Sequence, residues 1–246
     1  MLSYKEFSAF CVGVTDFIAD NFPYPSLEFN YTYKSDGTEV TDTDLYIEDR
    51  IRKVIKEKFP EHGILGEERE SYNDVAKIKW IIDPIDGTFG YTKSVPLFGT
   101  LIGLLKNDEP LYGFMRLPLI GDTWISGDGS VALHDGKPIA PTPHQSWKKS
   151  LILTTDQQTI EKSPINSYWQ SALKYGASAR TWGDCFGYYL VCIGKAELMA
   201  DTNLKPFDIL PLIPILRGAG LEVHNVECSN FENILACKSG VFEQLK

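Results

Sequence analysis

The feature that most constrains the fold of this 246-residue chain is a short apolar run, residues 78–83, which ends in an aspartate. Such a run is typical of a buried strand, and Pro84 predicts that the strand stops there. Asp86 comes three residues after Asp83, so two carboxylates crowd one turn. Like charges repel, and a divalent cation removes the repulsion. Because hard oxygen ligands suit Mg²⁺ better than Zn²⁺, the sequence predicts a magnesium site.

Gly87 and Thr88 follow the second aspartate and indicate what such a metal would face. Glycine lets a backbone approach closely, and a helix starting here would point free N–H groups at a phosphate. Asp208 is a third acidic candidate in the first turn of a later helix, where it could also serve only as a partner of the helix dipole. The alternative for the whole stretch is a calcium-type structural loop or a plain Asp-rich turn.

Apolar spacing predicts the other elements. Helices are expected over residues 3–20 (ended by Pro23 and Pro25), from a cap at Thr41 or Thr43 to about 59, over 157–175, over 184–193 with Asp184 as the cap, and over 206–217. Strands are expected over residues 98–106, 111–117, 124–126, 131–133, 151–154, 196–200, 221–223 and 234–237.

Helices and strands alternate along the chain, but hairpins also occur. The expected fold class is therefore α/β of the mixed α+β kind, a layered sandwich rather than a βαβ barrel. Residues 135–149, rich in Pro, Gly, His and Lys, predict a connection between two halves of one compact unit. We place these halves at residues 1–140, which hold the metal-binding motifs, and 141–246, which complete the site.

Composition excludes several classes of function. The net charge of −9 repels nucleic acid and anionic lipid, so an anionic substrate needs a local cation. No apolar run is long enough for a membrane helix, and the N-terminus lacks the pattern of a signal peptide. The five cysteines form no CxxC pair, which argues against a disulfide framework or a zinc cluster. We expect a cytoplasmic protein with reduced thiols.

Three parts of the sequence together resemble the inositol monophosphatase superfamily, namely Gly66-Glu67-Glu68, the run from Trp80 to Thr88, and Asp208. The resemblance covers nearly the whole chain. It implies a Mg²⁺-dependent, often lithium-sensitive phosphomonoesterase, built as an αβαβα sandwich and commonly a homodimer. The substrate implied is a small phosphate monoester.

The resemblance also implies roles for individual residues. The implied metal ligands, for two or three Mg²⁺ ions that Mn²⁺ can replace, are Glu67, Asp83, the Ile85 carbonyl, Asp86 and Asp208. The residues implied to position and activate the attacking water are Glu67, Thr88 and Asp44, and those implied to contact the phosphate are Asp86, Gly87 and Thr88. Lys34 matches more loosely a lysine near a weaker third metal. For Asp44, a helix-capping carboxylate is the alternative.

The stretch from Arg180 to Leu190 looks like the histidinol-phosphate phosphatase branch of this superfamily. Histidinol phosphate carries an ammonium and an imidazole, with which Asp184 and Asp201 could pair; the alternative is that Asp184 only caps its helix. Phe207 departs from the usual Trp before the last metal Asp. Residues 89–93 lack the basic residue and Ser-Phe of the branch, which weakens the substrate assignment.

The leading hypothesis is thus a Mg²⁺-dependent histidinol-phosphate phosphatase that acts in histidine biosynthesis. The alternatives are an inositol-1-phosphate phosphatase, a phosphatase of other sugar or nucleotide phosphates, and a regulatory binding module that has lost catalysis. The retained acidic residues argue against the last.

Overall fold

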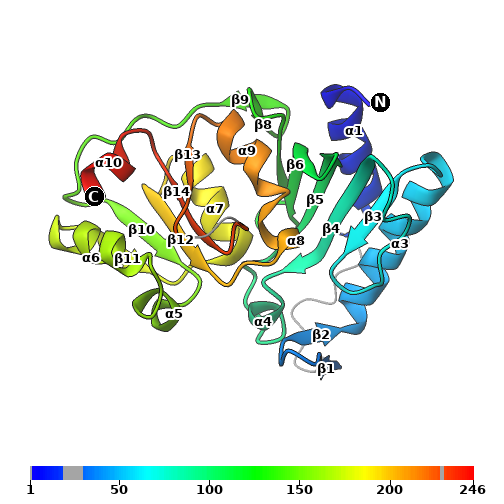
Figure 1. Cartoon of the computed structure of the whole chain (residues 1–246), viewed down its shortest axis with the longest axis horizontal. Helices are drawn as coiled ribbons and strands as arrows, with labels where there is room; N and C mark the ends of the chain where they lie inside the picture. The colour runs from blue at the N-terminus through cyan, green and yellow to red at the C-terminus, as the bar shows by residue number, and fades with distance from the viewer. Residues whose placement is uncertain (1, 19–29, 228–229) are drawn as a thin grey trace.

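The computed structural model describes residues 2–18, 30–227 and 230–246. Its described part forms five layers, helices alternating with two sheets (Figure 1). This confirms the predicted αβαβα sandwich of mixed α+β class. The expected end of the first helix at Pro23 and Pro25, and the thiol of Cys228, fall outside the described residues. Among the described residues, none of the helices has the length and apolar character needed to cross a membrane.

The larger of the two sheets, here the large sheet, has seven strands in the described residues. Their order is β3 (Gly63–Gly66), β4 (Ile78–Asp86), β5 (Gly99–Lys106), β6 (Glu109–Leu117), β7 (Thr123–Gly127), β8 (Ala132–His134) and β9 (Lys137–Ile139). Neighbouring strands are antiparallel except β3 and β4, which are parallel. Hairpins therefore build most of this sheet.

The small sheet has five strands in the described residues and mixed pairing. Their order is β11 (Ser178–Arg180), β10 (Leu151–Thr154), β12 (Leu198–Thr202), β14 (Asn233–Cys237) and β13 (Glu222–Asn225). Strand β10 is parallel to both β11 and β12. A separate hairpin consists of β1 (Tyr31–Tyr33) and β2 (Glu39–Thr41).

The helices fill the three remaining layers. They are α1 (Tyr4–Thr15), α3 (Asp42–Lys58), α4 (Thr88–Tyr91), α5 (Gln157–Glu161), α6 (Asn166–Lys174), α7 (Asp184–Cys192), α8 (Pro206–Ile209), α9 (Leu212–Gly218) and α10 (Val241–Leu245). Helices α7, α8 and α9 lie between the two sheets, α1 and α3 cover the outer face of the large sheet, and α5, α6 and α10 lie beyond the small sheet (Figure 1). Three apolar cores fill the spaces between successive layers.

Reciprocal capping boxes fix the starts of the two outer helices. The Ser3 side chain accepts from the Glu6 N–H, and the Glu6 carboxylate accepts from the Ser3 N–H. At α3 the same exchange joins Thr41 and Asp44. Each box satisfies N–H groups that a helix start leaves without partners. Thr41 is thus the cap of α3, one of the two residues predicted for this role.

The prediction that Pro84 ends its strand is wrong. Strand β4 continues to Asp86, with a shift in its register against β5 between Asp83 and Asp86. An irregularity of this kind tolerates a proline, because the residue there donates no ladder hydrogen bond. The Pro84 carbonyl accepts instead from the Thr100 hydroxyl, at 2.8 Å. The two aspartates consequently stand on one irregular strand end.

Two predicted helices are each broken in two. The helix expected over 157–175 is interrupted between α5 and α6, where Pro164 lacks the N–H needed to continue the ladder. The helix expected over 206–217 is divided into α8 and α9 at Pro211 for the same reason. The second break leaves Asp208 on a short helix of its own, beside the end of β4.

The connection expected over 135–149 is shorter than predicted, because β9 pairs with β8 and extends the large sheet to Ile139. The next strand, β10, begins at Leu151 in the small sheet. The division of the chain into halves at residue 140 stays a prediction.

Candidate active site

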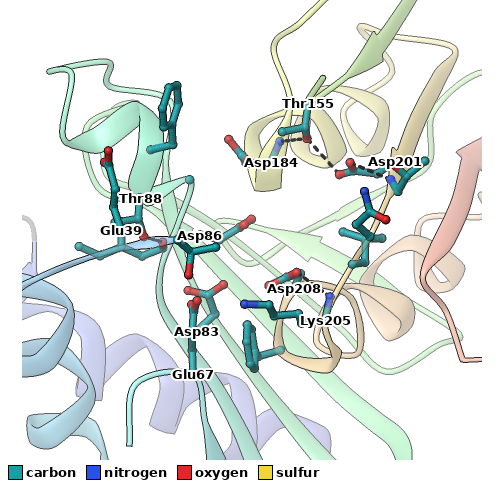
Figure 2. A pocket seen from close by; sticks show the side chains of 18 of the residues that line it. Glu39, Glu67, Asp83, Asp86, Thr88, Thr155, Asp184, Asp201, Lys205 and Asp208 are labelled. Atoms are coloured by element: carbon teal, nitrogen blue, oxygen red, sulfur yellow. Dashed lines mark hydrogen bonds between the residues drawn. The ribbon is translucent and has the colours of Figure 1, made fainter. Parts of the chain in front are cut away.

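A cleft of about 560 Å³ opens where β4, α4, α7, β12 and α8 meet (Figure 2). Nine of the ten residues predicted for the site line it: Glu67, Asp83, Ile85, Asp86, Gly87, Thr88, Asp184, Asp201 and Asp208. The tenth, Asp44, is fully buried behind the cleft wall. The topology therefore gathers residues that are up to 141 positions apart in the sequence, the separation of Glu67 and Asp208.

Three carboxylates converge at the floor of the cleft. Oxygen atoms of Asp83, Asp86 and Asp208 lie within 4.8 Å of one another. Burial, and then the neighbouring carboxylates, raise the pKa of Asp83 and Asp86 well above the ordinary value, and burial raises that of Asp208 to about 7. These groups resist ionisation together unless a cation joins them.

The donor set fits a hard divalent cation. Asp83 is 1% exposed, and its Oδ1 has no hydrogen-bond partner in the described structure. Buried carboxylate oxygens normally have a hydrogen-bond partner. The side chains that face Asp83 are also carboxylates, namely Glu67, Asp86 and Asp208. An oxygen-only set of this kind is the one that Mg²⁺ prefers.

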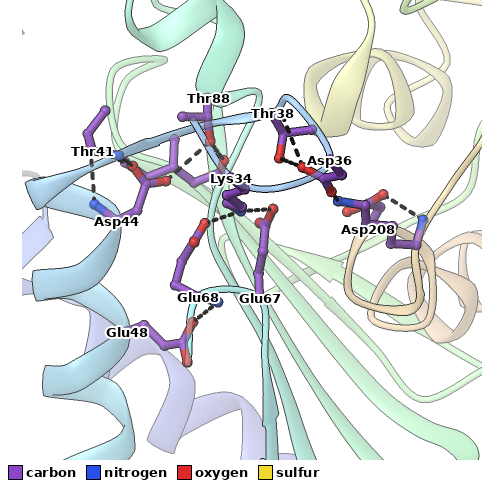
Figure 3. A network of polar contacts seen from close by, with 12 residues as sticks. Lys34, Asp36, Thr38, Thr41, Asp44, Glu48, Glu67, Glu68, Thr88 and Asp208 are labelled. Carbon is purple, nitrogen blue, oxygen red and sulfur yellow. Dashed lines mark hydrogen bonds and ion pairs between the residues drawn. The ribbon is translucent and has the colours of Figure 1, made fainter. Parts of the chain in front are cut away.

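Glu67 follows β3 and points toward Asp83 in Figure 2. The Lys34 ammonium lies 2.7 Å from Glu67 Oε1 and 2.6 Å from Glu68 Oε1, beside the cluster (Figure 3). Burial opposes the charge on Lys34, but the two carboxylates outweigh it and raise its pKa. The β1–β2 hairpin thus contributes a fixed positive charge next to Glu67.

Asp44 reaches the cleft through Thr88. The Thr88 hydroxyl lies 2.7 Å from the Ile85 carbonyl oxygen and 3.2 Å from Asp44 Oδ1, so it can donate to either (Figure 3). Burial raises the pKa of Asp44 to about 6, even though the Thr41 hydroxyl and N–H lower it. Asp44 is therefore both the carboxylate partner of Thr41 in the α3 capping box and a proton acceptor in contact with Thr88.

Gly87 is a glycine that the site geometry requires. Its φ is +99°, a conformation that side chains disfavour, and an added Cβ would lie 3.2 Å from Asp184 Oδ2. It precedes α4, which begins at Thr88 and so meets the condition set for a phosphate-facing helix start. Across the same gap, the Cys185 N–H at the start of α7 donates to Asp86 Oδ2.

Asp184 does not cap its helix, which corrects that prediction. The N-cap of α7 is Gly183, with no side-chain hydrogen bond. Instead the Asp184 N–H donates to the Thr155 hydroxyl at 2.9 Å, and that hydroxyl in turn donates to Asp201 Oδ2 at 3.1 Å (Figure 2). Thr155 was missed from the sequence. A signal existed, because parallel strands β10 and β12 bring Thr155 beside Asp201 at their carboxyl ends.

Two ion pairs at the rim were also missed. The Lys205 ammonium contacts Asp36 of the β1–β2 turn, and the Lys93 ammonium lies 2.7 Å from Glu39 Oε1. The ion pairs of Lys34 and Lys205 therefore hold the hairpin turn toward the cleft. Neither pair has a local sequence pattern, since its members come from elements that only the fold brings together.

A second group of donor side chains, Glu222, His224 and Cys237, lies on β13 and β14. Its carboxylate accepts from the Gly240 N–H and lies 3.1 Å from His224 Nε2. Because these polar atoms already have partners, the group does not show the unpaired oxygen that distinguishes the cleft.

The comparison with known families agrees with this geometry. The sequence profile of the inositol monophosphatase family matches residues 5–244. The chain belongs to this family. It is therefore a phosphatase, a hydrolase of phosphate monoesters from a metal-dependent family.

Relatives within the inositol monophosphatase family carry more than one substrate name. The histidinol-phosphatase of Chlorobaculum parvum is 34% identical over 187 residues, 76% of this chain and 72% of that protein. An inositol monophosphatase from Zymomonas mobilis, 26% identical, superposes with a TM-score of 0.82 over 100% of this chain and 98% of its own. An IMPase/NADP phosphatase complexed with Mg²⁺ and phosphate, 18% identical, shares the fold with a TM-score of 0.83 over 98% of this chain and 94% of its own.

The cleft of this family member is strongly acidic. Among the described residues that line it are seven carboxylate residues, namely Glu39, Glu67, Asp83, Asp86, Asp184, Asp201 and Asp208, but a single basic residue, Lys205. Lys205 is already paired with Asp36. An anionic ester can enter such a cleft only together with cations that reverse the local field.

Proposed function

We propose that this phosphatase is Mg²⁺-dependent and hydrolyses histidinol phosphate. Glu67, Asp83, Asp86, Asp208 and the Ile85 carbonyl would hold the metal, which supplies charge neutralisation and acidification of bound water. The support for these ligands is the convergence of three of the carboxylates within 4.8 Å and the unpaired Asp83 oxygen. The number of ions in this proposal is two or three, with Mn²⁺ as a replacement for Mg²⁺.

The proton path runs from the cleft to Asp44. Thr88 lines the cleft and contacts Asp44 Oδ1 with its hydroxyl, so it can orient a water molecule and pass the proton on to the carboxylate. A base whose pKa lies near 6 suits proton transfer close to neutral pH. Glu67, held by Lys34, would orient the same water from the other side. The start of α4 at Gly87 and Thr88 would present backbone N–H groups to the phosphate.

The observation that carries the choice of substrate is the pair of carboxylates opposite the metal cluster. Asp184 and Asp201 lie across the cleft from Asp83, joined through the Thr155 hydroxyl (Figure 2). Burial raises the pKa of Asp184 to about 6 and that of Asp201 well above the ordinary value. A positive group between them would favour their ionised form. The ammonium and imidazole of histidinol phosphate supply such a group, whereas neutral inositol does not.

Inositol 1-phosphate is the second candidate. The structure of the Zymomonas mobilis inositol monophosphatase matches the whole length of this chain. The hydroxyl groups of inositol can donate hydrogen bonds to a carboxylate such as Asp201. This candidate gains less from Asp184, whose buried charge a neutral ligand leaves uncompensated.

A substrate panel with Asp184→Asn tests the proposal. The panel contains histidinol phosphate, inositol 1-phosphate and a nucleotide monophosphate, each with Mg²⁺. We expect the wild type to prefer histidinol phosphate, and Asp184→Asn to lower kcat/KM for it about tenfold or more, the size of a lost charge-assisted hydrogen bond. Asp156→Asn is the matched control, because Asp156 caps α5 near the cleft and asparagine caps equally well.

A preference for inositol 1-phosphate, with equal histidinol phosphate turnover by the wild type and Asp184→Asn, would defeat the substrate assignment. Absence of phosphate release from every ester would instead favour the regulatory binding module.

A further inference from the structure

Unpaired polar atoms gather at the cleft. In the described structure, four buried side-chain atoms lack a hydrogen-bond partner: Asp83 Oδ1, Trp169 Nε1, Tyr188 Oη and Thr202 Oγ1. All of these residues except Trp169 line the cleft. Buried polar groups nearly always have a partner, so this gathering indicates a ligand that supplies the missing contacts. Asp83 belongs to the carboxylate cluster, but Tyr188 has no part in the hydrolysis described above.

Tyr188 is built into the core and reaches the cleft from α7. Its side chain is 1% exposed and packs among the apolar residues between the two sheets. It follows Asp184 by four residues, so the two side chains share one face of the helix. Burial, and then the surrounding carboxylates, raise its pKa, so the phenol stays protonated. A neutral phenol can both donate and accept a hydrogen bond.

Tyr188 shares a helix face with Asp184, which lies across the cleft from Asp83 (Figure 2). Besides burial, four carboxylates raise the pKa of Tyr188, in order of effect Asp201, Asp86, Asp208 and Asp184. Asp201 lies on the side of the cleft opposite Asp83 and Glu67 (Figure 2). The hydroxyl thus lines the cleft from the same helix as Asp184, on the side that would receive the organic group of the ester.

We propose that Tyr188 determines specificity by hydrogen-bonding the polar organic group of the phosphate ester, beside Asp201. This inference rests on the proposed phosphatase function. If the substrate is histidinol phosphate, the group contacted is its ammonium or imidazole. Within the part of the chain that the structure describes, the hydroxyl has no hydrogen-bond partner, so the ester would supply one.

This arrangement predicts opposite effects on stability for two adjacent tyrosines. Tyr189 is the matched control, because its hydroxyl bonds Thr123 and it is not part of the cleft lining. Removing a paired hydroxyl costs stability, whereas removing an unpaired buried one does not. We therefore expect Tyr189→Phe to lower the thermal midpoint of the ligand-free protein, and Tyr188→Phe to leave it equal or raise it.

Substrate selectivity should be changed by Tyr188→Phe and left unchanged by Tyr189→Phe. The readout is the ratio of kcat/KM for histidinol phosphate to that for p-nitrophenyl phosphate, whose organic group has no ammonium or imidazole. We expect Tyr188→Phe to lower this ratio about tenfold, the size of a hydrogen bond to a charged group. Tyr189→Phe should keep the wild-type ratio.

An unchanged ratio in Tyr188→Phe would overturn the inference, and so would a lowered thermal midpoint or failure to fold, since each assigns the hydroxyl a structural role. The proposed function fails separately, if the wild type prefers inositol 1-phosphate. The inference is then judged by the ratio of kcat/KM for inositol 1-phosphate to that for p-nitrophenyl phosphate. A tenfold loss of this ratio in Tyr188→Phe would support the inference.

Discussion

At the level of single residues, three carboxylates of the cleft are each held by a hydrogen-bond donor, two of them from distant parts of the chain. Cys185 binds Asp86, the Lys205 N–H binds Asp208, and Lys34 binds Glu67. The stretch from Asp83 to Thr88 could be predicted from sequence because its spacing is local, whereas Asp208 was included through the resemblance to a family. The donors to the carboxylates were harder to predict, because a donor such as Thr155 is recognised only when strands β10 and β12 are taken to be adjacent.

Asp86→Asn should abolish activity while the fold persists. The change removes one charge from a buried cluster whose members raise one another's pKa, so the metal-free variant should unfold at the same or a higher temperature. We expect kcat/KM to fall more than about 100-fold, beyond the range typical of residues that only support a metal ligand. Steady-state kinetics with Mg²⁺ and thermal unfolding measure the two effects.

The control for this variant is Asp108→Asn, which removes an exposed carboxylate paired with Lys79. Near-normal turnover by Asp86→Asn would show that the ligand assignment is wrong.

Thr88→Ala should lose the proton path to Asp44. General-base catalysis contributes about 10²–10⁴-fold, so a loss in kcat within this range is expected. Thr88→Ser keeps the hydroxyl and should retain most of the activity. If Ala and Ser variants are equally active, the hydroxyl does not act in the reaction.

At the level of elements, the sequence predicts local structure well where one short pattern decides it. Strands were expected over residues 98–106 and 111–117, and the structure joins β5 and β6 through Asn107 and Asp108, which both have positive φ values. Strand β6 begins two residues earlier than expected, at Glu109. The start of α3 was also predicted from a local pattern, since Thr41 was one of the two residues expected to cap it.

Helix breaks were predicted less well, since apolar periodicity continues across them. The patterns over 157–175 and 206–217 remain helical on average, but Pro164 and Pro211 each remove a hydrogen-bond donor from the ladder. Pro84 had the opposite outcome, because a register shift let the strand continue past it. A proline therefore either breaks an element or is tolerated in it, according to whether a hydrogen-bond donor is needed at that position. Only the neighbouring element determines this need.

The close packing of α9 on the large sheet depends on glycine. A Cβ at Gly113 of β6 would lie 1.8 Å from the Pro211 carbonyl oxygen, so the helix would have to move. We expect Gly113→Ala to destabilise the protein by at least the ~1–3 kcal/mol typical of overpacking. Gly13→Ala is the control, because its Cβ would meet nothing within 4 Å in α1 and should stabilise by ~0.5–1 kcal/mol. Urea unfolding of both variants measures these changes, and equal midpoints would contradict the packing account.

At the level of the whole molecule, the layered fold places carboxylates from both sheets around one cleft. Strand β4 of the large sheet contributes Asp83 and Asp86, and β12 of the small sheet contributes Asp201. The chain as a whole carries a net charge of −9, so its long-range field does not attract phosphate esters. The proposed cations would therefore be essential for binding as well as for chemistry.

The cluster should make the stability of the metal-free protein depend on pH. Burial raises the pKa of Asp44 and Asp184 to about 6 and that of Asp208 to about 7, from an ordinary value of 3.8. The folded state therefore binds more protons than the unfolded state between these values, and folding stability falls as the pH rises from about 4 to 7. We expect the thermal midpoint in EDTA to fall across this range.

Mg²⁺ should restore stability most at the upper end of the range, because the ligand carboxylates must be ionised to bind it. A thermal midpoint in EDTA that rises steadily from pH 5 to 7.5 would contradict the proposal that the buried carboxylates destabilise the metal-free protein when they ionise.

The central claim is that divalent ions occupy the carboxylate cluster and allow an acidic protein to bind an acidic ester. The most direct test is anomalous X-ray scattering from crystals grown with Mn²⁺ and phosphate. We expect strong anomalous peaks in contact with Asp83, Asp86 and Asp208, with phosphate oxygen beside them and no such peaks in crystals of Asp83→Asn. A cluster that holds no metal ion under these conditions, with phosphate bound or not, would contradict the account.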